Sequence, residues 1–277
     1  MKKIIARMSL LLAGFLFFAG CDTVEAPYVE GNPFTCDYNS NLPTRKVLIE
    51  DFTGYQCVNC PRATAELHAI IERYPCHVVP VAIHYGFFAE PFSASDPDYR
   101  AAEAATIGSY FEITEALPIG MVNRQNENGN FNIQFEDWNT TLFNILLANH
   151  LADVEILCSN SFTNGVLSYT ITANPINDLG ISYNLVAMIT EDKVIGMQKD
   201  GSILVNDYEH NHMLRTGLLG ENTAWGIPVS LPYLGNFSYT WPVEAGWVPE
   251  NCNLVVYVYN NATKEVIQVE QFEIATE

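Results

Sequence analysis

The sequence is short of positive charge. Its 277 residues include 13 Lys and Arg against 32 Asp and Glu, which gives a formal net charge of −19. A surface of that sign repels polyanions, so neither nucleic acid nor an anionic membrane surface is expected as a partner. Charged residues make up only 16% of the chain, whereas 48% are hydrophobic and 12% aromatic. That composition argues against a disordered chain and predicts packed domains.

Long apolar runs are missing from the chain after the N-terminal stretch. None of the later runs approaches the roughly 20 residues that a membrane-spanning helix needs. Residues 1–20 combine a positive start with an apolar stretch from Met8 to Phe18, which is typical of an export signal. The stretch ends in Phe18-Ala19-Gly20-Cys21, which resembles a bacterial lipobox. We therefore expect a signal peptide over residues 1–20 and a lipid on Cys21, which would attach the protein to the membrane. An ordinary signal peptide cleaved near this point is the alternative.

The chain has seven cysteines, a number that fits an exported protein. Cys21 is assigned to lipid and a Cys57-x-x-Cys60 pair to a separate site, which leaves four cysteines with three possible pairings. From their positions we predict two structural bridges, Cys36–Cys76 and Cys158–Cys252. The alternative is that some of the four are buried free thiols.

Three regions follow the signal. Residues 21–44 are rich in Pro, Asn and acidic residues and have no period, so they are expected to form a tether. Residues 45–152 form a predicted α/β domain, and its first patterns are a strand, a helix and a strand in the order that implies parallel pairing. Its elements are expected at Val47–Phe52, Arg62–Tyr74, Val78–His84, Tyr99–Tyr110, a strand after Pro118, a turn at Asn126–Asn130, a return strand at Phe131–Phe135 and a helix at Asp137–Leu151.

The sequence pattern changes in residues 153–277. Short runs rich in Val, Ile, Tyr and Thr alternate with turns of Asn, Gly and Pro, and helical periods are absent. This pattern predicts an all-β sandwich of immunoglobulin-like type.

The stretch Val47 to Ala65 carries the most specific chemistry. An apolar strand ends in a Gly-containing turn, Cys57 and Cys60 follow, and a helical pattern begins behind Pro61. The pair is thus expected at a helix N-terminus, where free amides and the helix dipole favour a thiolate. A structural disulfide closing a tight turn is the main alternative. A zinc half-site is the weaker one, because no second Cys or His pair completes the ligand set. No cofactor is expected.

Residues 45–151 resemble the thioredoxin fold, and in particular the membrane-anchored thiol–disulfide oxidoreductases of the bacterial envelope. The resemblance rests on Cys57-Val58-Asn59-Cys60, on the β–α–β order, and on Leu117-Pro118-Ile119-Gly120-Met121-Val122. It implies that Cys57 is an exposed nucleophile, that Cys60 is a buried resolving thiol, and that Pro118 is a cis-proline shaping the groove for a partner's backbone. Gln56 replaces the usual aromatic, and Val-Asn is an unusual intervening pair, so the direction of electron flow stays open.

Three further groups are candidates. His84 ends the strand beside Val47–Phe52 and would stabilise a thiolate as imidazolium, unless it only caps the strand end. Glu50 or Asp51 would accept a proton from Cys60, and a solvated charge is the alternative. His210 and His212 would share one face of a strand, a spacing that suits a metal or a shared carboxylate. The alternative is a pair of hydrogen-bonded histidines, since no third ligand is evident.

Taken together, the lipobox, E-D-F-T-G-x-x-C-x-x-C-P, P-x-G-x-V-N-R and Y-x-H-N-H-x-L-R resemble one group, the envelope lipoproteins related to the twenty-eight-kilodalton outer membrane protein. The resemblance implies a bacterial outer membrane location and a thioredoxin-like domain followed by a β domain. The expected function is thiol–disulfide exchange on envelope proteins that carry thiols or disulfides. A non-catalytic binding or adhesion lipoprotein with a structural Cys57–Cys60 bond is the alternative.

Overall fold

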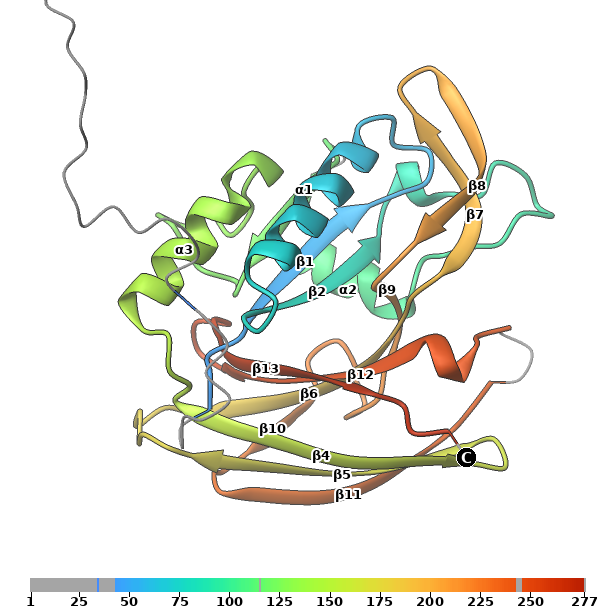
Figure 1. Ribbon diagram of the computed structural model, residues 1–277. Helices are drawn as coiled ribbons and strands as arrows, with labels where there is room; N and C mark the ends of the chain where they lie inside the picture. The colour runs from blue at the N-terminus through green and yellow to red at the C-terminus, as the bar shows by residue number, and fades with distance from the viewer. Residues whose placement is uncertain (1–33, 35–42, 115, 243–245, 277) are drawn as a thin grey trace, which may run out of the picture. The chain divides into compact units, whose positions relative to one another are not determined.

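The computed structural model describes residues 34, 43–114, 116–242 and 246–276, in which strands predominate and helices are few (Figure 1). No helix among these residues is long and apolar enough to cross a membrane. Besides short 3-10 turns, the elements in chain order are β1 (Val47–Thr53), α1 (Cys60–Arg73), β2 (Val78–His84), α2 (Ala102–Tyr110), β3 (Ile119–Val122), α3 (Trp138–Ala148), β4 (Val154–Thr163), β5 (Val166–Pro175), β6 (Tyr183–Glu191), β7 (Val194–Asp200), β8 (Ile203–His210), β9 (Met213–Gly217), β10 (Ile227–Val229), β11 (Tyr233–Thr240), β12 (Cys252–Asn260) and β13 (Val266–Glu273).

The largest sheet has eight strands and includes strands from both halves of the chain. Its order is β13-β12-β6-β9-β2-β1-β3, with β10 paired to β6. β1 and β2 are parallel, as the β–α–β pattern predicted, and β3 runs antiparallel to β1. The two halves meet where Ala82 of β2 pairs with Met213 of β9. The predicted domain boundary at residues 152–153 falls between α3 and β4 and remains a prediction.

Strand β1 is buried along its whole length because both of its faces are covered. Val47 and Ile49 pack with residues of α1 and α3 in one hydrophobic cluster. Leu48 and Phe52, which point the other way, pack with residues of α2 and β12. This arrangement explains the continuous apolar run Val47-Leu48-Ile49, where a half-exposed strand would alternate.

The second half of the chain is built mainly from two packed β layers. A three-stranded sheet, β11-β5-β4, packs against β6 and β12 of the large sheet. Alternate residues of β4 and β5 point into this core, namely Val154, Ile156, Leu167, Tyr169, Ile171 and Ala173. The β-rich character predicted for this half is therefore present, and its immunoglobulin-like type remains a prediction.

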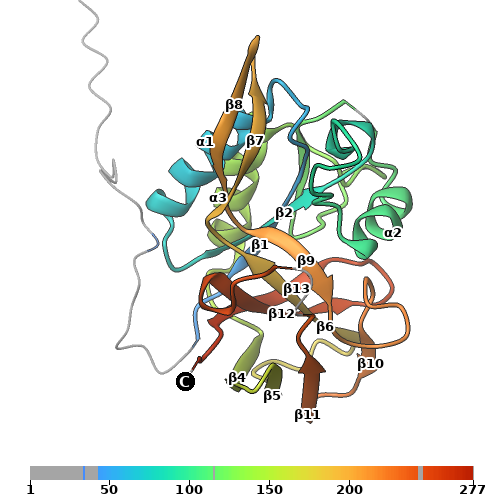
Figure 2. The same ribbon diagram turned by 90° about the vertical axis from the view of Figure 1, so that its right-hand side faces the viewer.

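Strands β7 and β8 depart from that arrangement. They pair with each other as a separate two-stranded sheet, and the resulting hairpin stands beside α1 and away from β4, β5 and β11 (Figures 1 and 2). The hairpin comes from the second half of the chain but lies against the first half. The sequence pattern had indicated two ordinary strands of a sandwich at this point.

The prediction of a return strand at Phe131–Phe135 is wrong. Only Ile133 makes a bridge, to Gly120. The preceding turn instead bonds to itself, because Asn126 Oδ1 accepts from the Gly129 N–H at 2.6 Å and Asn130 Oδ1 accepts from the Asn132 N–H at 3.0 Å. Such local side-chain bonds compete with ladder formation.

Candidate functional site

Cys57 and Cys60 form a disulfide, with 5.4 Å between their Cα atoms. Cys60 is the first residue of α1, and Pro61 behind it has no N–H to satisfy. The Asn59 side chain does not cap the helix, and its first turn carries no acidic residue. The first turn of α1 therefore has no carboxylate of its own to offset the positive end of the helix dipole, which acts on the dithiol.

The loop that carries Cys57 is held close to a second loop, which begins after β2. A Cβ on Gly54 would lie 2.4 Å from the Phe88 carbonyl oxygen, so only glycine allows this approach. The Gln56 N–H donates to the same oxygen at 2.9 Å, and the Cys57 N–H donates to the Gly54 carbonyl at 2.9 Å. The Gly in the predicted turn is therefore required for close packing.

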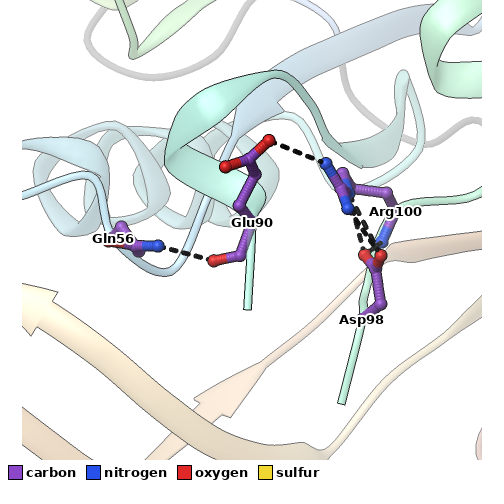
Figure 3. Close-up of polar contacts among 4 residues, drawn as sticks. All are labelled: Gln56, Glu90, Asp98 and Arg100. Atoms are coloured by element: carbon purple, nitrogen blue, oxygen red, sulfur yellow. Dashed lines mark hydrogen bonds and ion pairs between the residues drawn. The ribbon is translucent and has the colours of Figure 1, made fainter. Parts of the chain in front are cut away.

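Gln56, which stands where the resemblance expects an aromatic residue, extends this attachment (Figure 3). Its side-chain amide donates to the Glu90 carbonyl oxygen at 2.6 Å. Further along the same loop, the Arg100 guanidinium lies 3.6 Å from the Glu90 carboxylate and 2.7 Å from that of Asp98. Gln56 thus joins the dithiol loop to a charged loop that is ordered by its own ion pairs.

The expectation that Cys57 is exposed is wrong. Cys57 is 2% exposed and Cys60 only 1%. The cover includes the β7–β8 hairpin: the Lys199 N–H donates to the Tyr55 carbonyl at 2.8 Å, and the Gly201 N–H donates to the Val58 carbonyl at 3.0 Å. The sequence places Lys199 and Gly201 about 140 residues from the pair, so no local pattern could indicate this contact.

Gln198 of β7 is a further residue that sequence reasoning missed. It is 2% exposed, and its side-chain amide donates to the Cys57 carbonyl at 3.0 Å and to the Lys199 carbonyl at 2.9 Å. The bond to Cys57 fixes the hairpin on the dithiol loop, and the bond to Lys199 stays within the hairpin. In the sequence, Gln198 looks like an ordinary polar strand residue.

Glu50 is excluded as a proton acceptor for Cys60. Its carboxylate accepts two hydrogen bonds from the Arg124 guanidinium, both at 2.7 Å, and Arg124 also donates to the Tyr257 hydroxyl at 2.9 Å. Glu50 and Arg124 are both buried. The Arg124 guanidinium also lies over the rings of Phe111, Trp225, Tyr257 and Tyr259. This group joins β1 to β12 and serves the packing between the two halves.

Asp51 remains as the acidic candidate. Because side chains alternate along a strand, it shares the face of Val47 and Ile49, which pack against α1. It is 2% exposed, and its Oδ1 has no hydrogen-bond partner among the described residues. Burial raises the pKa of Asp51 from its ordinary 3.8 to about 7. A carboxyl with that pKa is partly ionised near neutral pH and is suited to exchange a proton.

Tyr208 of β8 links Asp51 to the start of α1. Burial raises the pKa of the Tyr208 hydroxyl, the Asp51 carboxylate raises it further, and a hydrogen bond with Thr64 lowers it. The Thr64 hydroxyl in turn donates to the Cys60 carbonyl at 3.3 Å. Tyr208 thus bonds to Thr64 near the start of α1 and lies close enough to Asp51 for that carboxylate to act on its hydroxyl.

His84 does not fit the role expected for it. It is 2% exposed, both ring nitrogens lack hydrogen-bond partners among the described residues, and its ring packs against Tyr99 and His210. Burial, together with His210 and Arg215, lowers the pKa of His84 well below its usual value. The ring is therefore neutral at neutral pH and does not supply an imidazolium to a thiolate.

His210 and His212 do not share one strand face. β8 ends at His210, and His212 has a positive φ of 58°, which turns the chain toward β9. His210 faces His84 and Tyr99, whereas His212 Nδ1 lies 3.1 Å from the Asp192 carboxylate. In the part of the chain that the structure describes, no three His, Cys, Asp or Glu side chains gather as metal ligands.

Pro118 lies at the end of the sheet from which the dithiol loop departs. Ile119 is paired with Phe52, so Pro118 stands one position further, beside the end of β1. The Leu117–Pro118 peptide bond is cis. Pro118 and the dithiol loop thus lie at the same sheet end, and its role in docking a partner remains a proposal.

The other cysteines give a mixed outcome. Cys76 is disulfide-bonded, while Cys36, its expected partner, and Cys21 lie outside the described residues. The predicted Cys158–Cys252 bridge is wrong, because both are free thiols. Cys158 belongs to the three-stranded sheet and Cys252 to the facing one, so the packed core lies between the two layers that carry them. Burial raises the pKa of Cys158 to about 11 and also raises that of Cys252, which keeps both protonated.

Several solved structures resemble this chain. HBP35 of Porphyromonas gingivalis shares its fold with a TM-score of 0.65 and 14% identity, covering 83% of this chain and 76% of that one. A domain of the outer membrane lipoprotein Omp28 from Porphyromonas gingivalis is 22% identical, covering 46% of this chain and 91% of that one, with a TM-score of 0.36. A protein from Agrobacterium tumefaciens is 12% identical, covering 82% and 94%, with a TM-score of 0.49. No curated protein matches the chain.

The family is shown by sequence. The family model described as outer membrane protein Omp28 matches residues 104–277, which is more than half of the chain. This agrees with the group that the sequence motifs indicated and with the outer membrane location expected from it. The chain therefore belongs to the Omp28 family of outer membrane proteins.

Proposed function

We propose that this protein is a thioredoxin-like lipoprotein that exchanges disulfides with other proteins of the cell envelope. The observation that carries the proposal is the Cys57–Cys60 disulfide at the uncapped N-terminus of α1, with the carboxyl of Asp51 buried on the α1 side of β1. The parallel β1–α1–β2 unit and the antiparallel β3 that follows Pro118 support the thioredoxin-like interpretation.

The chemistry begins from the reduced pair. The Cys57 thiolate attacks one sulfur of a partner disulfide, a bond forms between Cys57 Sγ and that sulfur, and the partner's other sulfur leaves as a thiolate and is protonated by solvent. Cys60 then attacks Cys57 Sγ, so the Cys57–Cys60 bond forms and the mixed disulfide breaks. Two electrons pass to the partner. The reverse sequence oxidises a partner dithiol.

We assign to Asp51 the transfer of the Cys60 proton. Its carboxylate accepts the Cys60 proton before Cys60 attacks, and it returns that proton to the departing partner thiolate. A pKa of about 7 suits both directions. Thr64 and Tyr208 hold the surroundings of Asp51 in place.

The decisive test is the trapping of a mixed disulfide in cells. A Cys60→Ser variant lacks the resolving thiol, so it should accumulate covalent complexes with envelope proteins that disappear on reduction. The matched control carries Cys57→Ser in addition and should form none. A Cys60→Ser variant that forms no complex above this control would refute the exchange reaction.

A second candidate function is non-catalytic binding, with the Cys57–Cys60 bond as a structural staple. The burial of both sulfurs favours it. A reduction potential below about −300 mV, with no turnover of insulin disulfides, would support the staple. A higher potential with turnover would support exchange.

The membrane anchor is proposed to be a lipid on Cys21. Metabolic labelling with palmitate should label the wild-type protein and should fail with Cys21→Ser. Labelling of the variant would refute this assignment.

A further inference from the structure

The β7–β8 hairpin contacts the dithiol loop through backbone groups, as an added strand would. Lys199 and Gly201 donate their N–H groups to the carbonyls of Tyr55 and Val58, which lie on either side of Cys57. The Gln198 side chain donates to the Cys57 carbonyl itself. Extended segments of partner proteins commonly bind by pairing with exposed backbone groups in this way. The hairpin therefore stands where an incoming polypeptide would bind next to the disulfide.

The outer part of the hairpin is held there mainly by polar contacts, whereas its base also packs through the His210 ring against His84 and Tyr99. Among the described hydrophobic residues of the hairpin, only Val194, at its base, packs against a hydrophobic core cluster. Three large apolar side chains on the rest of it are exposed, Ile195 at 59%, Ile203 at 65% and Leu204 at 44%, while Met197 and Val205 are half-buried. A two-stranded hairpin with few buried apolar contacts belongs to the least stable parts of a fold. Its contacts with the dithiol loop can break without unfolding the core.

The base of the hairpin is fixed to the large sheet. Its two connections each pass through a residue with a positive φ, Lys193 at 59° and His212 at 58°. The Lys193 N–H donates to Asn211 Oδ1 at 2.8 Å, and the His212 N–H donates to Asp192 Oδ1 at 2.7 Å. Asp192 also accepts from Asn253 of β12 at 2.9 Å. A fixed base and a weakly packed outer part allow the hairpin to move as a lid while its root stays in register.

We infer that the β7–β8 hairpin is a built-in competitor that closes the Cys57–Cys60 site and is displaced by an extended segment of the partner protein. This inference rests on the proposed exchange function, and it adds the control of access to it. The partner segment would bind the Tyr55 and Val58 carbonyls that the hairpin vacates.

Two variants of the full-length protein open the lid in different ways. Gln198→Glu replaces the donor amide with a carboxylate that faces the carbonyl oxygens of Cys57 and Lys199. The second variant replaces residues 197–207 by Asn-Gly, which removes Gln198, Lys199 and Gly201 but keeps Tyr208; the chain closes because Gly196 and Tyr208 are paired and Asn-Gly forms a two-residue hairpin turn. Gln134→Glu, at an exposed position, is the matched control.

The measurement is the rate at which dithiothreitol reduces the oxidised pair, followed by alkylation and mass analysis of Cys57 and Cys60. Dithiothreitol becomes a cyclic disulfide as the two cysteines become thiols. We expect at least tenfold faster reduction in the shortened variant, a several-fold increase in Gln198→Glu, and no change in Gln134→Glu. A carboxylate near the pair disfavours a thiolate and by itself would slow the reaction, so acceleration in Gln198→Glu reports access.

If both opened variants keep native circular dichroism and melting but are reduced by dithiothreitol at the wild-type rate, the lid proposal is overturned. Insulin turnover, measured in parallel, tests the exchange function separately. Faster reduction of the opened variants by dithiothreitol, without insulin turnover, would support the lid proposal and refute the exchange function. Insulin turnover at equal rates in all variants would retain exchange and refute the lid. If neither variant folds, hydrogen exchange of the wild-type protein decides: the Lys199 and Gly201 amides should exchange at least tenfold faster than that of Ile49, and equal protection would overturn the lid.

Discussion

Replacing Asp51 by Asn should stabilise the protein at alkaline pH and leave it unchanged at acid pH. Asn has nearly the size of a protonated carboxyl but cannot ionise. In the wild-type protein, the buried carboxyl must either keep its proton or hold a charge away from water, and burial raises its pKa to about 7. The substitution removes this conflict.

The size and sign follow from proton linkage. In the unfolded chain Asp51 ionises with a pKa near 3.9, so between that pH and 7 the unfolded state loses its proton first and is favoured. Ionisation of Asp51 does not lower the free energy of unfolding below about pH 3.9. The loss grows as pH rises above that value and stops growing once the native carboxyl also ionises near pH 7. With roughly 1.4 kcal/mol per pKa unit, a shift of about three units predicts a loss of roughly 4 kcal/mol at pH 8.

The assay is thermal unfolding of the oxidised protein between pH 3.5 and 8, with wild type and Asp51→Asn compared at each pH. The difference in melting temperature should be near zero at pH 3.5 and about 10 °C in favour of the variant at pH 8, since 1 kcal/mol shifts a chain of this size by about 2–4 °C. Other titrating groups occur in both proteins, so their effects cancel in the difference.

Asp207→Asn, at an exposed position on the hairpin, is the control and should follow wild type at every pH. A constant difference between Asp51→Asn and wild type across the pH range would refute the reasoning, because a carboxyl with an ordinary pKa gives no pH-dependent difference in this window. The variant should also resolve mixed disulfides more slowly, since the proposed proton acceptor for Cys60 is lost.

Three further outcomes are expected. Arg124→Met should lower the free energy of unfolding, measured in urea, by about 3–5 kcal/mol, because it leaves the Glu50 carboxylate buried without its partner. A second change, Glu50→Met, should restore the stability. Such a restoration would show that the loss comes from the unpaired charge and not from a change in side-chain volume. His210→Gln should reduce the loss of stability on acidification: burial lowers the pKa of His210 to about 4, so the wild-type protein loses roughly 3 kcal/mol as pH falls from 6.5 to 4, and identical pH profiles would contradict this. Alkylation of denatured, unreduced protein should label Cys158 and Cys252, and protection of both would restore the bridge between them.

The sequence by itself determined the local framework of the site. The apolar run at Val47, the turn with Gly54 and the helical period behind Pro61 specify a strand, a loop and a helix whatever surrounds them, because those signals act over a few residues. The family followed from motifs of the same short range. Cys57 and Cys60 are separated by only three positions, so their juxtaposition needed no tertiary information.

Only the tertiary structure decided what surrounds that framework. Glu50 and Asp51 are neighbours in sequence, but strand alternation sends Glu50 to Arg124 and Asp51 to the α1 face, so one is paired and the other is left with a raised pKa. Likewise, the burial of Cys57 depends on Gln198, Lys199 and Gly201. Contacts over such separations arise when two packed halves meet, and no periodicity or spacing in the chain encodes which hairpin will lie on which loop.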